Sequence, residues 1–186
     1  MRSITYDCGY CGNSVASDYG YFGTERIQEL HGGYDVTHQI CICPHCNLPT
    51  FFSPSGSQAP GPSVGGDVAH IPSVEVKALY DEARACMKVN AHTAAAMCCR
   101  KLLMNVAVAE GAKPNLRFLQ YADFLVDEGH VTRKAKGWVD HIRKKGNEAN
   151  HEINIFSSED AQRLMKFSEM MLRVVYEYPA EAENPS

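Results

Sequence analysis

The spacing of apolar residues changes near residue 70 of the chain. From Pro72 onward, apolar residues recur every three or four positions, which is the period of an amphipathic helix. This pattern predicts five helices, at about residues 72–87, 92–110, 116–128, 132–151 and 157–178. Before residue 53 the glycine-bounded segments 19–23 and 34–42 predict short strands. We therefore expect a mainly α protein, a bundle of about five helices preceded by a small β-rich unit.

The apolar positions also predict which residues form the core. In the first helix they are Val76, Leu79, Tyr80, Ala83 and Met87. The second helix is almost entirely small or apolar from Ala94 to Cys99, so we expect it to be the most buried. In the fifth helix, alternating spacings of three and four join Leu164, Phe167, Met171, Val174 and Tyr178. That stripe suits either the core or a contact between two copies.

Residues 53–70 have the composition of a domain boundary. Ser, Pro and Gly dominate this stretch, and no apolar period is present, which predicts a linker. The predicted organisation is a zinc ribbon at 1–52, a linker at 53–70, a helical domain at 71–178, and a short tail at 179–186. We expect the acidic tail to be disordered.

The overall composition is that of a globular protein and limits its partners. The 186 residues are 45% hydrophobic and 22% charged, and the net charge of -4 gives no general attraction to nucleic acid or anionic lipid. No apolar run approaches the ~20 residues that span a bilayer, and the N-terminus lacks the apolar core of a signal peptide. We expect a cytoplasmic location, without a membrane partner, where cysteines bind metal more often than they form disulfides.

Two CxxC motifs near the N-terminus predict a metal site. Each CxxC turn directs two thiolates at one point, so two turns complete a tetrahedral sulfur site for structural Zn²⁺. The expected ligands are Cys8, Cys11, Cys43 and Cys46, with Cys41 as an alternative to Cys43. A redox CxxC is the competing interpretation, but that chemistry uses a single pair that opens a helix.

The N-terminal unit has the sequence pattern of a zinc ribbon. It is too small to build much of a core, so the metal is expected to supply most of its folding free energy. Residues 1–52 contain two arginines, Arg2 and Arg26, against five carboxylates: Asp7, Asp18, Glu25, Glu29 and Asp35. A surface that binds phosphates needs the opposite balance, so we expect a structural or protein-binding role.

A second candidate site lies in the predicted fourth helix. Arg143, Asn147 and His151 recur at i, i+4 and i+8, so they form one column on that helix. Between residues 133 and 145 six basic residues accompany a single acid, Asp140. Within this basic segment we expect nucleic-acid contacts from Arg133, Lys136, Lys144 and Lys145.

The column contains the residue types that cleave RNA without a metal. His151 titrates near neutral pH and can take the proton of a 2′-hydroxyl, while Arg143 can stabilise the phosphorane. Asn147 could orient either group. The alternative is an ordinary solvated face, in which His151 interacts with the helix macrodipole and Asn147 caps or bridges the helix.

These features together resemble a known family. The chain is similar to the prokaryotic 4145 domain-of-unknown-function family in its paired cysteines, the segment 79–83, the alanine-rich helix with Arg100, and the pattern of Arg143, Gly146, Asn147 and His151. That family resembles a branch of the HEPN superfamily. The resemblance extends over residues 1–178 and implies a HEPN-like helical bundle that often dimerises. Many HEPN members are metal-independent ribonucleases with a composite site at the dimer interface. By position, His151 would be the catalytic histidine, while Gly146 stands where active members have arginine.

Two functions follow from these expectations. The first is a defence-associated HEPN-like protein that cleaves RNA with Arg143, Asn147 and His151 at a homodimer interface formed by the fourth and fifth helices. The alternative is a non-catalytic module that binds a partner protein or nucleic acid within a restriction, toxin–antitoxin or anti-phage complex. The sequence indicates no cofactor besides Zn²⁺.

Overall fold

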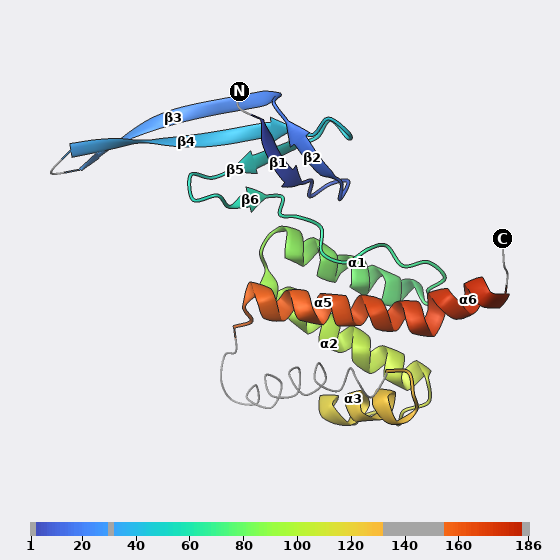
Figure 1. The fold of residues 1–186 in the computed structure, drawn as a ribbon. Helices are drawn as coiled ribbons and strands as arrows, with labels where there is room; N and C mark the ends of the chain where they lie inside the picture. Colours follow the sequence, from blue (N-terminus) through green and yellow to red (C-terminus); the bar gives the residue numbers. More distant parts are fainter. Residues whose placement is uncertain (1–2, 30–31, 132–154, 184–186) are drawn as a thin grey trace. The chain divides into compact units, whose positions relative to one another are not determined.

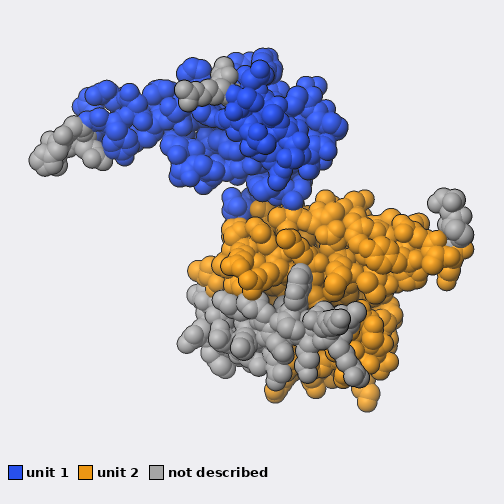
Figure 2. Space-filling model, viewed as in Figure 1, with its two compact units in different colours: residues 1–63, 88–90 blue, residues 64–87, 91–186 orange. Residues whose placement is uncertain are grey.

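The structure, a computed structural model, describes residues 3–29, 32–131 and 155–183. The chain divides into two compact units (Figure 2). Unit 1 contains residues 1–63 and 88–90, and unit 2 contains residues 64–87 and 91–186. The predicted fourth helix, at 132–151, lies outside the described residues.

Unit 1 is built from two antiparallel sheets (Figure 1). Strand β1 (Ile4–Asp7) pairs with β2 (Ser14–Ser17). The second sheet has the order β3-β4-β5-β6, in which β3 (Gly20–Glu29) and β4 (Gly32–Ile42) form a long hairpin. The shorter strands β5 (Pro49–Phe52) and β6 (Gln58–Ala59) complete it.

The core of unit 1 is small and rich in sulfur. Its buried apolar residues are Tyr6, Cys8, Cys41 and Cys43. The Tyr6 ring packs edge-on against Phe52, with 5.2 Å between ring centroids, and so joins the two sheets. Because three of the four buried residues are cysteines, apolar side chains alone contribute little to the stability of this unit.

Unit 2 is helical in its described residues. It contains α1 (Val74–Lys88), α2 (His92–Ala109), α3 (Phe118–Asp127) and α5 (Ser158–Leu172). A π-helical turn, η3 (Arg173–Glu177), connects α5 to the short α6 (Tyr178–Glu183). The first, second, third and fifth predicted helices are therefore confirmed. No described helix is long and apolar enough to cross a membrane.

The predicted core positions of unit 2 are confirmed on most of the helices. On α1, Tyr80, Ala83 and Met87 are buried, and α2 buries Ala95, Ala96 and Cys99. The predicted apolar stripe of the fifth helix is only partly buried. Its first three members, Leu164, Phe167 and Met171, lie in the core, whereas Val174 is 41% exposed and Tyr178 is 52% exposed.

Part of the segment expected as a linker is integrated into the two units. β6 belongs to the second sheet of unit 1. Residues 64–70, which we call the strap, pack on unit 2, where Val68 is only 1% exposed. The Tyr80 hydroxyl donates to the Gly66 carbonyl at 2.9 Å, and the Ala69 N–H donates to the Glu177 carboxylate at 2.6 Å. The strap is thus a structural part of the helical unit.

The expectation of a mainly α protein, a five-helix bundle with a small ribbon, was wrong. The described residues form a mixed α/β protein with six strands in two sheets and four helices of ten residues or more. The strands were underestimated because both faces of the outer hairpin are solvated. Thr24, Glu25 and Arg26 are all exposed, so β3 shows no alternation of apolar and polar residues there.

Candidate metal centre

Each CxxC motif forms a tight turn that closes on its own first cysteine. In the first turn the Gly12 N–H donates to the Cys8 carbonyl at 2.9 Å, and in the second the Asn47 N–H donates to the Cys43 carbonyl at 2.9 Å. Gly12 and Asn47 each follow the second cysteine of their motif and have positive φ values of 74° and 58°. Glycine and asparagine tolerate this left-handed conformation best, which explains their presence there.

The two turns bring four thiols together. The Sγ atoms of Cys8, Cys11, Cys43 and Cys46 all lie within 4.8 Å of one another. The Cys8–Cys46 and Cys11–Cys43 pairs are separated by 3.7 Å and 3.8 Å. A tetrahedral site with Zn–S bonds of about 2.3 Å would place its sulfurs about 3.8 Å apart. The same distances are far too long for a disulfide bond, so the group fits a tetrahedral metal ion.

Electrostatics at the cluster also favour a bound cation. The Asn13 backbone N–H is the main cause that lowers the pKa of the Cys11 thiol to about 6. At Cys46 the Leu48 N–H acts in the same direction, but burial and the neighbouring thiols outweigh it and raise the pKa to about 12. Four thiolates this close therefore repel one another unless a cation neutralises them.

Residues from outside the motifs hold the two turns in place. The buried Ser17 hydroxyl donates to the carbonyl of Ile42, at 2.7 Å, immediately before the second motif. The Gln58 side-chain amide donates to the Asp7 carbonyl at 2.8 Å and to the Pro60 carbonyl at 3.0 Å, next to the first motif. Neither residue was predicted, because a lone Ser and a Gln in a Pro/Gly-rich stretch give no local signal.

Cys41 is excluded from the cluster. It is completely buried in the core of unit 1, where it pairs with Thr50 across the β4–β5 ladder. Burial raises the pKa of the Cys41 thiol, which favours its neutral form. The group that could hold a metal ion therefore contains Cys43 and not Cys41, the alternative that the sequence left open.

The predicted catalytic and nucleic-acid-binding residues all lie outside the described residues. This applies to Arg143, Asn147 and His151 and to the basic residues Arg133, Lys136, Lys144 and Lys145. Arg100, which interrupts the apolar α2, is described. Its guanidinium lies 4.4 Å from the ring centroid of Phe118 at the start of α3, and its burial lowers its pKa.

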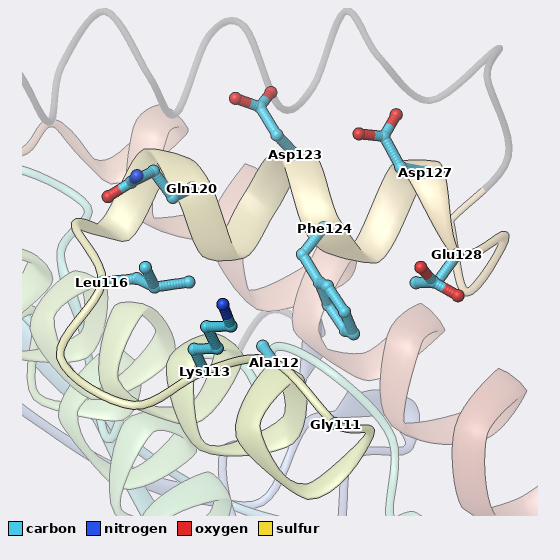
Figure 3. Close-up of a pocket in the computed structure, with 9 residues that line it drawn as sticks. All are labelled: Gly111, Ala112, Lys113, Leu116, Gln120, Asp123, Phe124, Asp127 and Glu128. Atoms are coloured by element: carbon cyan, nitrogen blue, oxygen red, sulfur yellow. The ribbon is translucent and has the colours of Figure 1, made fainter.

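Unit 2 has a pocket of about 460 Å³ between α3 and the loop that precedes it (Figure 3). Its apolar lining includes Leu116 and Phe124. Among the lining residues Asp123 and Asp127 project from α3 away from Phe124. Among the described residues, three carboxylates and a single lysine line the pocket, so this part of its lining is acidic.

The fold and the site together define a mixed α/β protein with a four-cysteine group that could hold a metal ion. Residues 81–185 match the family model described as Domain of unknown function (DUF4145). That match covers more than half of the chain, which therefore belongs to this family, as the resemblance in its sequence predicted. The matched region does not include the four thiols. No curated protein and no solved structure matches the chain.

Proposed function

We propose that the four-cysteine centre binds Zn²⁺ and that the ion is structural. The supporting observation is the set of four thiols at tetrahedral spacing. A catalytic zinc keeps one position open for water or substrate, whereas four thiolates close the coordination sphere. When bound, the ion would neutralise the thiolates and fix the two turns to each other. Other residues of unit 1 position the two turns and exclude water from Cys8 and Cys43.

Metal analysis of two matched variants tests this assignment. The purified protein should contain one zinc per chain, and Cys43→Ala should lose it. Cys41→Ala, which removes a thiol from the same strand end but not from the cluster, should retain it. Iron also binds tetrahedral sulfur sites, but it would give a coloured protein. Zinc loss in Cys41→Ala together with retention in Cys43→Ala would refute the ligand set.

For the whole chain we propose a non-catalytic binding protein of a prokaryotic defence complex, of the restriction, toxin–antitoxin or anti-phage kind. Support for the defence setting comes from the sequence resemblance of the Arg143, Gly146, Asn147 and His151 pattern to the HEPN superfamily. Support for binding comes from unit 1, whose closed sulfur centre serves a scaffold rather than a reaction. The acidic balance of residues 1–52 makes a protein the favoured partner of this unit.

A second candidate is a metal-independent ribonuclease that acts as a cytoplasmic homodimer. Its support is the sequence column of Arg143, Asn147 and His151 beside the basic segment at 133–145. In this mechanism His151 removes the proton of the 2′-hydroxyl and Arg143 stabilises the phosphorane.

Cleavage of a mixed RNA pool without added divalent metal separates the two functions. The parent protein would be compared with His151→Ala and Arg143→Ala, each shown to be folded and zinc-loaded. His130→Ala serves as the control, since His130 stacks on Phe124 in unit 2. Cleavage that only the first two substitutions abolish establishes the ribonuclease. No cleavage by any protein supports the binding function.

A further inference from the structure

The edge of strand β3 lacks the usual protection of an outer strand. The sheet order leaves one side of β3 without a neighbouring strand, and no backbone hydrogen bond from another described residue reaches that side. An edge strand presents unpaired N–H and C=O groups, which proteins usually protect with Pro, with charged side chains, above all Lys, or by keeping the strand short. β3 is ten residues long and contains neither Pro nor Lys, and its charged residues are Glu25, Arg26 and Glu29.

The side chains of β3 are also unusual for a solvent-exposed edge. Tyr21 is 64% exposed and Phe22 is 66% exposed. The cation Arg26 could deter pairing, but its guanidinium forms an ion pair with Asp35 of β4 at 3.6 Å, on the occupied side of the strand. The free edge therefore presents unpaired backbone groups beside the exposed apolar side chains of Tyr21 and Phe22.

The outer part of the β3–β4 hairpin lacks a third strand. β5 pairs only with the end of β4, at Gln39–Ile42. Figure 1 shows the hairpin continuing past β5 as a two-stranded ribbon. A two-stranded ribbon is marginally stable in water, and a third strand stabilises it. The ribbon therefore favours an additional strand along β3.

We propose that a second copy of this chain supplies that strand: the two β3 strands pair antiparallel, centred on Thr24, and join the two four-stranded sheets into one. In this arrangement the outer part of each β3 pairs with the inner part of the other, so both ribbons gain a third strand. The proposal goes beyond the proposed function and does not depend on ribonuclease activity.

The backbone pattern limits the register. The Ile42 N–H donates to the Tyr19 carbonyl at 2.9 Å, which sets the phase of the antiparallel ladder between β3 and β4. Tyr19 therefore belongs to a hydrogen-bonded pair, and the odd-numbered residues of β3 direct their N–H and C=O groups at β4. The even-numbered residues from Gly20 to Gln28 direct theirs at the free edge. A register centred on Glu25 or on Arg26 would place like charges directly opposite each other and is disfavoured.

The register centred on Thr24 makes the side chains self-complementary. Within one copy, Phe51, Ile40 and Tyr21 lie opposite one another across β5, β4 and β3. The same ladder places Ile27 opposite Tyr34. Pairing about Thr24 sets Tyr21 opposite Ile27 of the second copy, so one apolar row crosses both sheets.

The other face of the joined sheet is complementary as well. There Phe22 lies opposite Arg26 of the second copy, which allows a cation–π contact. A register centred on Gly23 would instead place Tyr21 opposite a Glu25 carboxylate. The fit of β3 to itself is why we identify the occupant as a second copy rather than an unrelated strand.

Cysteine cross-linking tests the contact directly. Thr24→Cys should yield a disulfide-linked dimer under mild oxidation, because paired Cα atoms about 5.5 Å apart suit a disulfide. Thr37→Cys is the matched control, since Thr37 pairs with Thr24 across the β3–β4 ladder and is also exposed. In the joined sheet the two Thr37 positions would lie about 14 Å apart, too far for a disulfide. The parent, with its eight cysteines, gives the baseline.

The molecular mass in solution is a second, independent test of the proposed dimer. Light scattering should show the parent at twice the 20.6 kDa of the chain. Thr24→Pro removes an N–H at the free edge, so this variant should have the mass of one chain. Thr24→Val keeps that N–H and should have the mass of the dimer. Zinc content would verify that each variant is folded, and if Thr24→Pro fails to fold, the cross-linking decides. A monomeric parent, or a dimer with no preferential cross-link at Thr24→Cys, would overturn the proposal.

Discussion

Gly9, inside the first CxxC turn, shows how closely the metal centre is packed. A Cβ atom at this position would lie 2.7 Å from the Pro60 carbonyl oxygen and would also meet that of Gly61. Both contacts are with backbone, which cannot rotate away. The turn can therefore approach the segment before the strap only because residue 9 has no side chain.

Substitution of Gly9 should destabilise the metal centre. Gly9→Ala is expected to lower the free energy of unfolding of the zinc-loaded protein by about 1–3 kcal/mol, as overpacking does elsewhere. Urea denaturation followed by tyrosine fluorescence would measure it. Gly23→Ala is the control, since a Cβ there would meet no atom within 4 Å. Equal stability of the two variants would contradict the packing argument.

Cys99 illustrates the opposite type of cysteine environment. It is completely buried on α2, its Sγ lies 3.2 Å from the Met165 sulfur, and burial raises its pKa to about 12. The thiolate is the reactive form, and the raised pKa keeps the Cys99 thiol in its neutral form at pH 8. Iodoacetamide should therefore label Cys99 in the urea-unfolded protein but not in the native one, as peptide mass spectrometry would show. Rapid native labelling would mean that α2 and α5 separate readily.

At the level of elements, the strap is the segment whose structure was least predictable from the sequence. Its composition resembles a linker, yet Val68 lies in the core of unit 2, and Arg173 and Glu177 bind the strap backbone at Asp67 and Ala69. The bond from Arg173 to the Asp67 carbonyl measures 2.8 Å. These contacts join residues more than a hundred positions apart, so no local pattern could predict them.

Substitution within the strap should affect the whole helical unit. Val68→Ala is expected to cost about 2 kcal/mol, from lost burial and the cavity left behind. Val74→Ala is the matched control, because Val74 is 79% exposed at the start of α1 and should change stability by less than about 0.5 kcal/mol. Thermal unfolding followed by far-UV circular dichroism compares them. If both lose equal stability, the strap is not part of the core.

The elements differ in how well the sequence predicted them, and the reason is physical. α1, α2, α3 and α5 each bury one face, which imposes an apolar period that the sequence displays. Ser157 caps α5 with a local contact of the same kind, in which its hydroxyl accepts from the Asp160 N–H. The outer hairpin buries neither face, so its length, and with it the fold class, was not predictable in this way.

The four cysteines of the candidate metal centre were predictable for a similar reason, because a CxxC turn is a local geometry with a fixed spacing. The left-handed Gly12 and Asn47 could have been recognised as well, since each stands directly after its motif. Ser17 and Gln58 act across the sheets, and their partners are set by the tertiary fold alone.

For the whole molecule, the two units should respond differently to metal removal. The core of unit 1 is mostly cysteine, whereas unit 2 has a large apolar core drawn from four helices and the strap. Loss of zinc removes the cross-link of unit 1 but no contact of unit 2. Chelation should therefore unfold unit 1 and leave the helices of unit 2 intact.

Limited proteolysis would check this independence. After chelation, cleavage should appear within residues 3–63, while residues 91–131 stay protected. Re-addition of zinc should restore the original pattern. Simultaneous loss of protection in both regions would show that the helical unit depends on the metal.

The strap also has a consequence for the order in which the protein is made. The Ala69–Glu177 hydrogen bond joins residues 108 positions apart. At a synthesis rate of about 5–20 residues per second, the strap leaves the ribosome roughly 5–20 s before its binding site on η3 is made. Throughout that interval the strap lacks its partners Arg173 and Glu177, although all four cysteines of the candidate metal centre have already been made. A ribosome-bound chain would thus carry a finished first unit ahead of a helical unit that closes only when its last helix emerges.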